Sequence, residues 1–253
     1  MFIEERLKLI LERLREEESL SVEQIGEFLN VSKDTVRRDL RKLEARNLVT
    51  RTHGGVMRPQ LLAFEPTFEE RNLKYSEEKL KISKKAASLV RSGDIIFIDA
   101  GTTTEGMIDF LKDINNLTII TNALNVALKT VPLMNITTII LGGLLRKGNL
   151  STVGPDTEDI LREYHASKAF LGVSAIKPAF GLMTPNRYEA EIKKLMIKSA
   201  FEVYILSDHS KLNRIELVSF APLDEKINLI SDGQVPDAII REYEAYGARF
   251  ILA

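Results

Sequence analysis

Residues 31–43 read VSKDTVRRDLRKL, and this stretch predicts a helix with two unlike faces. Ser32 precedes the helix, where a side-chain oxygen can accept a hydrogen bond from a free backbone N–H. Val36, Leu40 and Leu43 follow at spacings of four and three residues, so they share one inward face. The outward face carries a row of cations: Lys33, Arg37, Arg38 and Arg41. Such a row is typical either of a helix surface that stays in water or of a contact for a polyanion.

Two further helices are predicted before this one. Ser21 and Gln24 have the spacing of a capping box, and apolar residues recur at helical intervals from residue 22 to residue 29. Residues 3–14 show the same periodicity. Two helices joined by a short turn at residues 30–31, the second with cations outward, form the helix-turn-helix arrangement.

Residues 48–52 and 56–57 predict two short strands after this pair of helices. The turn between them reads His53-Gly54-Gly55, and glycine can adopt the positive φ angles that a tight hairpin requires. A hairpin in this position is the wing of a winged helix. We therefore expect residues 1–57 to form a winged helix-turn-helix domain.

This architecture assigns the cations to DNA, because a helix fits the major groove and its first turns reach base edges. Hydroxyls near the helix start can hold a phosphate, and long planar arginines can bind guanine edges or phosphate. The candidate contacts are Ser32, Lys33, Thr35, Arg37, Arg38, Arg41, Arg51 and His53. For Thr35 and His53 the alternatives are an ordinary first-turn residue and a solvated turn residue.

Charge along the chain agrees with a local contact for a polyanion. The 35 basic and 36 acidic side chains give a net charge of −1, which excludes a uniformly basic protein. Residues 1–32 hold four basic and eight acidic side chains, a net of −4. Residues 33–58 hold eight basic and three acidic ones, a net of +5.

Composition excludes several classes of site. The chain has no cysteine and only three histidines, so neither a metal site nor a cofactor is expected. Charged residues already occur at positions 4–6, and the longest uncharged run, residues 130–145, is interrupted by proline and glycine. These features argue against a signal peptide and a membrane span, and predict a cytoplasmic protein.

Residues 58–75 contain Pro59 and Pro66 and read as a linker. From residue 76 to residue 253, short apolar runs alternate with amphipathic segments. This pattern predicts an α/β domain with a mostly parallel sheet. The expected strands are 95–98, 117–120, 136–141, 169–173, 203–206, 227–230 and 249–252. The expected helices are 76–91, 104–113, 123–131, 156–164, 188–200 and 236–246.

Small and polar residues follow several of these strands, and parallel sheets bind ligands beyond the carboxyl ends of their strands. The run from Asp99 to Thr104, DAGTTT, predicts an anion site at a helix start, although a threonine-capped turn without ligand is the alternative. It matches neither nucleotide-binding glycine pattern. Glu189 and Lys193 lie four residues apart, as either an exposed ion pair or groups that bind a sugar and an oxyanion.

The chain resembles the DeoR family of bacterial transcription regulators. The first motifs are VSKDTVRRDL at 31–40, Leu43-Glu44 and RTHGG at 51–55; the second half adds Lys79, DAGTT at 99–103, Thr121-Asn122, Gly142-Gly143, Gly154-Pro155, Glu189-Ala190 with Lys193, and DHSK at 208–211. This resemblance implies an operator-binding domain and a sensor domain similar in fold to ribose-5-phosphate isomerase and the CoA-transferases. It implies that Lys79 and the Gly101–Thr104 loop hold the phosphate of a sugar, with Asp99, Glu189 and Lys193 nearer the sugar itself.

The expected function is a regulator, most simply a repressor of a sugar-metabolism operon, that binds operator DNA and a phosphorylated sugar as a homo-oligomer (dimer or tetramer). The expected effector-binding residues are Lys79, Asp99, Gly101, Thr102, Thr103, Thr104, Thr121, Asn122, Gly142, Gly143, Thr184, Glu189, Lys193 and Lys211. One alternative is a sugar-phosphate isomerase with an added DNA-binding module, in which Asp99, Glu189 and Lys193 perform acid–base chemistry. The other is a protein-interaction module, which would show no salt-dependent DNA binding.

Overall fold

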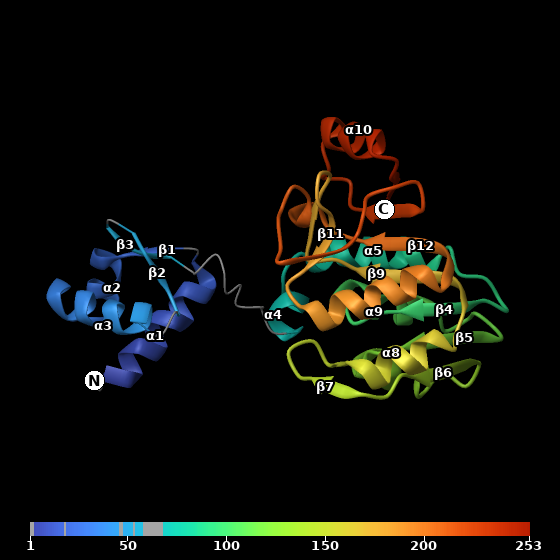
Figure 1. The fold of residues 1–253 in the computed structure, drawn as a ribbon, viewed down its shortest axis with the longest axis horizontal. Coiled ribbons are helices and arrows are strands. Elements are labelled where there is room, and N and C mark those ends of the chain that lie inside the picture. The colour runs from blue at the N-terminus through green and yellow to red at the C-terminus, as the bar shows by residue number, and fades with distance from the viewer. Residues whose placement is uncertain (1–2, 18, 46–47, 53, 58–67) are drawn as a thin grey trace. The chain divides into compact units, whose positions relative to one another are not determined.

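The computed structural model describes residues 3–17, 19–45, 48–52, 54–57 and 68–253. The chain divides into two compact units, Met1–Pro66 and Thr67–Ala253 (Figure 1). Of the sequence-based expectations, His53 and residues 58–67 of the linker lie outside the described residues. The remainder of the expected linker contains the short helix α4 (Phe68–Leu73), which belongs to the second unit.

The first unit is the winged helix-turn-helix that the sequence predicts. A three-stranded antiparallel sheet, in the order β1-β3-β2, packs with three helices. In chain order the elements are α1 (Ile3–Glu16), β1 (Ser19–Ser21), α2 (Val22–Leu29), α3 (Lys33–Ala45), β2 (Thr50–Arg51) and β3 (Gly55–Met57). Strand β1 was not expected, because three residues are too few to show a period.

Local sequence signals explain these elements. The Ser21 hydroxyl accepts a hydrogen bond from the Gln24 backbone N–H at 3.1 Å, and the Gln24 side chain accepts one from the Ser21 N–H at 2.8 Å, which completes the capping box. Val36, Leu40 and Leu43 are fully buried in the core of this unit, as their spacing predicts. Burial of such a side chain stabilises a fold by about 1.5–3 kcal/mol.

Gly55 is needed for a different reason from the expected one. Its φ angle is not positive, but a Cβ atom there would lie 2.1 Å from the Leu20 carbonyl oxygen. The close approach of β1 to β3 therefore excludes any side chain at this position.

A seven-stranded sheet forms the centre of the second unit, and every neighbouring pair in it is parallel. All seven expected strands are present. From one edge to the other they are β15 (Arg249–Leu252), β14 (Ile227–Ser231), β12 (Ala200–Leu206), β9 (Ala166–Gly172), β4 (Ile95–Ile98), β5 (Leu117–Thr121) and β6 (Ile136–Ile140). Because the strands are parallel, their carboxyl ends share one edge.

Helices cover both faces of this sheet (Figure 1). One buried cluster contains Ile82, Met107 and Val126, from α5 (Ser76–Ala87), η1 (Met107–Phe110) and α7 (Leu124–Thr130). The other contains residues of α8 (Pro155–Arg162), α9 (Arg187–Lys198) and α10 (Asp237–Ala245). The helix expected at 104–113 is instead the five-residue α6 (Thr102–Gly106) followed by the 3-10 turn η1.

Short antiparallel strands that the sequence did not predict lie between the main elements. A hairpin joins β7 (Leu144–Arg146) to β8 (Ser151–Val153). A second small sheet has the order β10-β11-β13, formed by β10 (Ala175–Lys177), β11 (Gly181–Thr184) and β13 (Val218–Ala221). Among the described residues, no helix is long and apolar enough to cross a membrane.

The strand order identifies where a ligand can enter. From β4 the chain proceeds outward through β5 to β6, and then returns to β9 on the other side of β4. The connections after β4 and β9 therefore lead away from each other at the carboxyl edge. Ligands of open α/β sheets bind at such a switch point.

Candidate DNA interface and effector site

The cations of α3 lie on its solvent-exposed face. Lys33, Arg37, Arg38 and Arg41 are all exposed. Arg37 is 3.3 Å from Asp34, and Lys33 pairs with Glu23, but all four of these side chains are more than half exposed. Exposed ion pairs contribute only about 0–1 kcal/mol, so these cations can exchange their partners for DNA phosphates.

The other expected DNA contacts are arranged around the start of α3 and in the wing. The Ser32 hydroxyl accepts a hydrogen bond from the Thr35 N–H at 3.3 Å and lies 3.0 Å from the Thr35 hydroxyl. Ser32 therefore caps the helix and remains exposed, whereas Thr35 is half-buried. Arg51 is exposed on β2.

One ion pair beneath this face was not predicted. Asp39 is only 1% exposed, and its carboxylate accepts hydrogen bonds from Arg6 Nε at 2.7 Å and Arg6 Nη2 at 3.1 Å. This bidentate contact ties α1 to α3 and raises the pKa of Arg6. The signal in the sequence is that Asp39 falls three residues after Val36, on the inward face.

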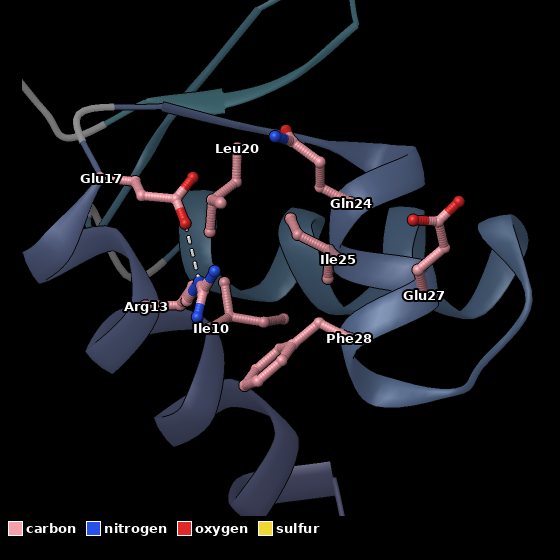
Figure 2. A pocket seen from close by; sticks show the side chains of 8 residues that line it. All are labelled: Ile10, Arg13, Glu17, Leu20, Gln24, Ile25, Glu27 and Phe28. Carbon is pink, nitrogen blue, oxygen red and sulfur yellow. Dashed lines mark hydrogen bonds and ion pairs between the residues drawn. The ribbon is translucent and has the colours of Figure 1, made fainter.

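The same unit contains a pocket between α1, β1 and α2. Its lining residues are Ile10, Arg13, Glu17, Leu20, Gln24, Ile25, Glu27 and Phe28, of which Glu17 directly follows α1 (Figure 2). Arg13 on its rim is already paired, with its Nε 2.8 Å from Glu17 and its guanidinium 5.5 Å from the centre of the Phe28 ring. None of the expected DNA or effector residues lines it.

Asp99 and Lys193 meet at the switch point of the second unit. The Asp99 carboxylate oxygens accept the Gly172 N–H at 3.0 and 2.9 Å, which bridges the ends of β4 and β9. Lys193 Nζ donates to Asp99 and, at 2.8 Å, to the Gly172 carbonyl. Both side chains are buried, so this pair places opposite charges in the interior at the switch point.

Glu189 has a separate set of partners in the same region. Its carboxylate accepts hydrogen bonds from Arg146 Nη1 at 2.8 Å, from the Thr184 hydroxyl at 2.9 Å and from Asn149. The exposed Glu189–Lys193 pair that spacing allowed is therefore not formed, because both residues are buried and paired elsewhere. Arg146 and Asn149 were missed, since they come from the β7–β8 hairpin.

The Asp99–Thr104 loop is held largely by its own hydrogen bonds. The Thr104 hydroxyl lies 3.1 Å from the Asp99 carbonyl and 3.0 Å from the Gly101 carbonyl, and it is fully buried. Ser83 of α5 donates to the Thr103 carbonyl at 2.6 Å. Because α6 has only five residues, its dipole is small. Positive charge for an anion must therefore come mainly from side chains.

Lys79 and Lys211 are placed to supply that charge. Lys79 lies one turn before Ser83 on α5 and is 8% exposed, and its Nζ donates to the Arg71 carbonyl. Burial lowers the pKa of Lys79 to about 8; Asp208 opposes this shift, whereas Lys211 and Arg71 add to it. Burial also lowers the pKa of Lys211. Sequence reasoning found both lysines but not Arg71.

The remaining expected residues differ in what they do. Thr121 is buried, and its hydroxyl accepts the Ala123 N–H at 3.0 Å. Asn122 donates to the Thr152 carbonyl at 2.9 Å, while its Oδ1 is buried without a hydrogen-bond partner in the part of the chain that the structure describes. That oxygen can accept a ligand hydroxyl.

Gly142 and Gly143 have a packing role. The Gly142 carbonyl accepts a hydrogen bond from the Thr157 hydroxyl at 2.6 Å. Gly143 has a φ of +134°, and a Cβ atom there would lie 2.0 Å from the same hydroxyl. The absence of a side chain at Gly143 lets the turn after β6 approach α8.

Comparison with known proteins agrees with this division into two units. Residues 6–60 match the DeoR-like helix-turn-helix domain, and residues 74–233 match the DeoR C terminal sensor domain. The chain is 35% identical to the HTH-type transcriptional regulator IolR of Bacillus subtilis, over 90% of this chain and 89% of IolR. It is 37% identical to the HTH-type transcriptional repressor GlcR of the same organism, over 92% and 89%.

The glycerol-3-phosphate regulon repressor of Escherichia coli is 31% identical over 92% of each chain. Among solved structures, ribose 5-phosphate isomerase A of Methanocaldococcus jannaschii aligns with 54% of each chain, at 21% identity and a TM-score of 0.40, which is too distant to support any conclusion. The full-length relatives are named as regulators, so the isomerase alternative is not retained. The chain belongs to the DeoR family of transcription regulators.

Proposed function

We propose that this chain is a repressor of a sugar-metabolism operon whose affinity for operator DNA is controlled by a phosphorylated sugar. The observation that carries this proposal is the collection of buried charge of both signs at the carboxyl edge of the sheet. Buried Lys79 and half-buried Lys211 provide cations there, while Asp99, Glu189 and Asn122 provide oxygens. An anion that also carries hydroxyl groups satisfies both sets.

The two kinds of group at this edge suit different parts of such a ligand. The phosphate goes to Lys79 and Lys211, because desolvated ammonium groups regain a favourable environment when an anion pairs with them. The hydroxyls go toward Asn122 and the Glu189 carboxylate. The names of two relatives, the glycerol-3-phosphate regulon repressor and the repressor GlcR, agree with a small phosphorylated compound and with repression.

Operator binding is assigned to α3 and the wing, through Arg37, Arg38 and Arg51 with Ser32, Lys33, Thr35, Arg41 and His53 around them. An effector changes operator affinity only by as much as it prefers one of the two conformations, DNA-competent or incompetent. Helix-turn-helix proteins commonly bind paired half-sites as dimers, so we propose a homodimer or tetramer. Effector binding then alters the spacing of two DNA-binding units.

The test is an electrophoretic mobility shift with DNA from the promoter of the gene that encodes this chain, with and without a panel of sugar phosphates. We expect a sequence-specific shift that weakens steeply with salt and that one sugar phosphate reverses. A thermal-shift screen with the same panel identifies the effector, since a ligand at 100 times its dissociation constant adds about 2.7 kcal/mol of stability. The absence of a sequence-specific shift would overturn the proposal.

A further inference from the structure

One edge of the Arg71 guanidinium, on α4, is buried without a binding partner within the described ranges. Its Nε and Nη2 atoms are buried and have no hydrogen-bond partner among the described residues. These two atoms form one edge of the guanidinium plane, the same edge through which Arg6 binds the two oxygens of Asp39. Leaving such an edge unpaired in the interior is costly.

The surroundings of Arg71 are strongly cationic. Arg71 acts electrostatically on both Lys79 and Lys211, and its own carbonyl accepts the Lys79 ammonium. The nearby carboxylates do not pair with the orphaned edge: Asp208 is engaged by Ser210, and neither Glu78 nor Glu216 forms an ion pair with Arg71. Arg71 thus adds positive charge near both Lys79 and Lys211, and Asp208 opposes its effect on each of them.

Helix α4 also packs against α6, the helix that begins at Thr102. Helix α5, which carries Lys79, packs against α6 as well, through the hydrogen bond from Ser83 to the Thr103 carbonyl. The guanidinium, the two ammonium groups and the threonine loop therefore border one region.

We propose that Arg71 binds the phosphate group of the effector through its Nε–Nη2 edge, together with Lys79 and Lys211, and that this contact couples α4 to the occupied site. A guanidinium edge matches two phosphate oxygens, whereas an ammonium group binds as a point charge. This inference rests on the proposed function and adds to it a ligand from a segment that the sequence assigned to the linker.

The position of Arg71 in the chain gives the contact a regulatory consequence. Helix α4 begins at Phe68, directly after the boundary between the two units at residues 66–67. An anion that pairs with Arg71 holds α4 against α6. Effector binding and the position of α4, the first described helix after the boundary, are then linked.

The test compares the full-length protein with Arg71→Met, using inorganic phosphate and glucose 6-phosphate as probes in thermal-shift and calorimetric titrations. Methionine keeps an unbranched apolar stem that reaches as far as Nε and removes the guanidinium and its charge, and the backbone carbonyl that accepts a hydrogen bond from Lys79 is unchanged. We expect the affinity for both probes to fall about tenfold to a hundredfold, as for a lost charge-assisted hydrogen-bonded pair. The ligand-free variant should be at least as stable as the wild type, because a desolvated cation has been removed.

Lys74→Met is the matched control, because it removes an exposed cation three residues away and should leave both titrations unchanged. If the wild type binds a probe and Arg71→Met binds it equally well, the role of Arg71 is overturned while the proposed function stands. If neither probe, nor any other sugar phosphate, stabilises the wild type, the proposed function itself fails.

Amide hydrogen exchange tests the coupling separately. Saturating phosphate should slow the exchange of residues 68–73 in the wild type, and this protection should be lost in Arg71→Met at concentrations that saturate the variant. Equal protection of α4 in both proteins at saturation would overturn the coupling and leave only a binding role for Arg71.

Discussion

Two groups of cations in this molecule have the same charge and opposite surroundings. Lys33, Arg37, Arg38 and Arg41 are exposed on α3, where their existing ion pairs are weak. Lys79 and Arg71 are desolvated at the carboxyl edge of the sheet. Exposed cations attract a long polyanion and are screened by salt, whereas buried ones accept only a small anion that fits among them. Burial, rather than charge, therefore separates the proposed DNA contact from the proposed effector contact.

The largest effect should come from removing the exposed arginines. Replacing both Arg37 and Arg38 by alanine should weaken operator binding at least about thirtyfold, because each specific contact contributes about 1–3 kcal/mol. The slope of log affinity against log salt should also become shallower. A mobility-shift titration at several salt concentrations measures both.

Effector-induced thermal stabilisation of this double variant should equal that of the wild type. The control is Lys8→Ala, which removes one positive charge from the exposed face of α1. An equal loss of DNA binding in that control would mean that net charge, and not the α3 face, governs the contact.

The Arg6–Asp39 pair joins α1 to the inward face of α3, the helix whose outward face carries the exposed row. Asp39→Asn should destabilise the first unit by about 2–3 kcal/mol, somewhat less than for a fully buried pair because Arg6 remains 14% exposed. Urea denaturation followed by circular dichroism measures this change.

Asp34→Asn breaks an exposed pair with Arg37 and should change stability by less than about 0.5 kcal/mol. Similar destabilisation by the two substitutions would contradict the distinction between the buried and the exposed pair.

The buried cluster should respond to pH in two opposite ways. The pKa of Lys79 falls from 10.5 to about 8 on folding, so the unfolded chain binds more protons between these values, and the ligand-free protein should gain stability as pH rises from 8 to 10.5. Phosphate requires the charged form of Lys79, so its affinity should fall up to about tenfold from pH 7 to pH 9.

Calorimetric titration across this range, with Lys79→Met as the control, measures the change in affinity. The variant should bind phosphate weakly at every pH and lose the dependence near pH 8. A wild-type affinity that stays constant from pH 7 to pH 9 would show that Lys79 does not bind the phosphate.

The smallest expected effect concerns the hydroxyl of Thr103, which is buried at the start of α6. Thr103→Val keeps the shape of the side chain and should weaken effector binding about fivefold, the loss of one neutral hydrogen bond. DNA binding without effector should be retained. The control is Thr118→Val near the amino end of β5, which is the end away from the carboxyl edge of the sheet. This substitution should change neither effector binding nor DNA binding. Loss of DNA binding in Thr103→Val would indicate a structural role instead.

Sequence periodicity predicted most of the fold because the main elements are locally encoded. The capping box of α2, the apolar stripe of α3 and the seven apolar runs each have a physical signature within a few residues. The small strands escaped prediction because three or four residues are too few to define a period. The long helix expected after β4 was also wrong, since the structure has α6 and a 3-10 turn there.

Those residues of the candidate site that follow strands of the main sheet could be predicted from the sequence. Asp99, Asn122 and Asp208 stand directly after strands in the sequence, and parallel pairing then brings them to one edge. Arg71, Arg146 and Asn149 do not follow any strand of the main sheet, so no local rule could associate them with it. Their positions depend on the packing of α4 and of the β7–β8 hairpin.

The sequence by itself determined the elements, the exposed basic face of α3 and the shared edge of the parallel strands, because each follows from short-range spacing. Only the tertiary structure decided which charges are buried and with which partners. Asp39 pairs with Arg6, Glu189 with Arg146, and Lys193 with Asp99, over separations of 33, 43 and 94 residues. Such pairing results from long-range packing. It determines whether a charged residue is exposed to water, forms a buried ion pair or is free to bind a ligand.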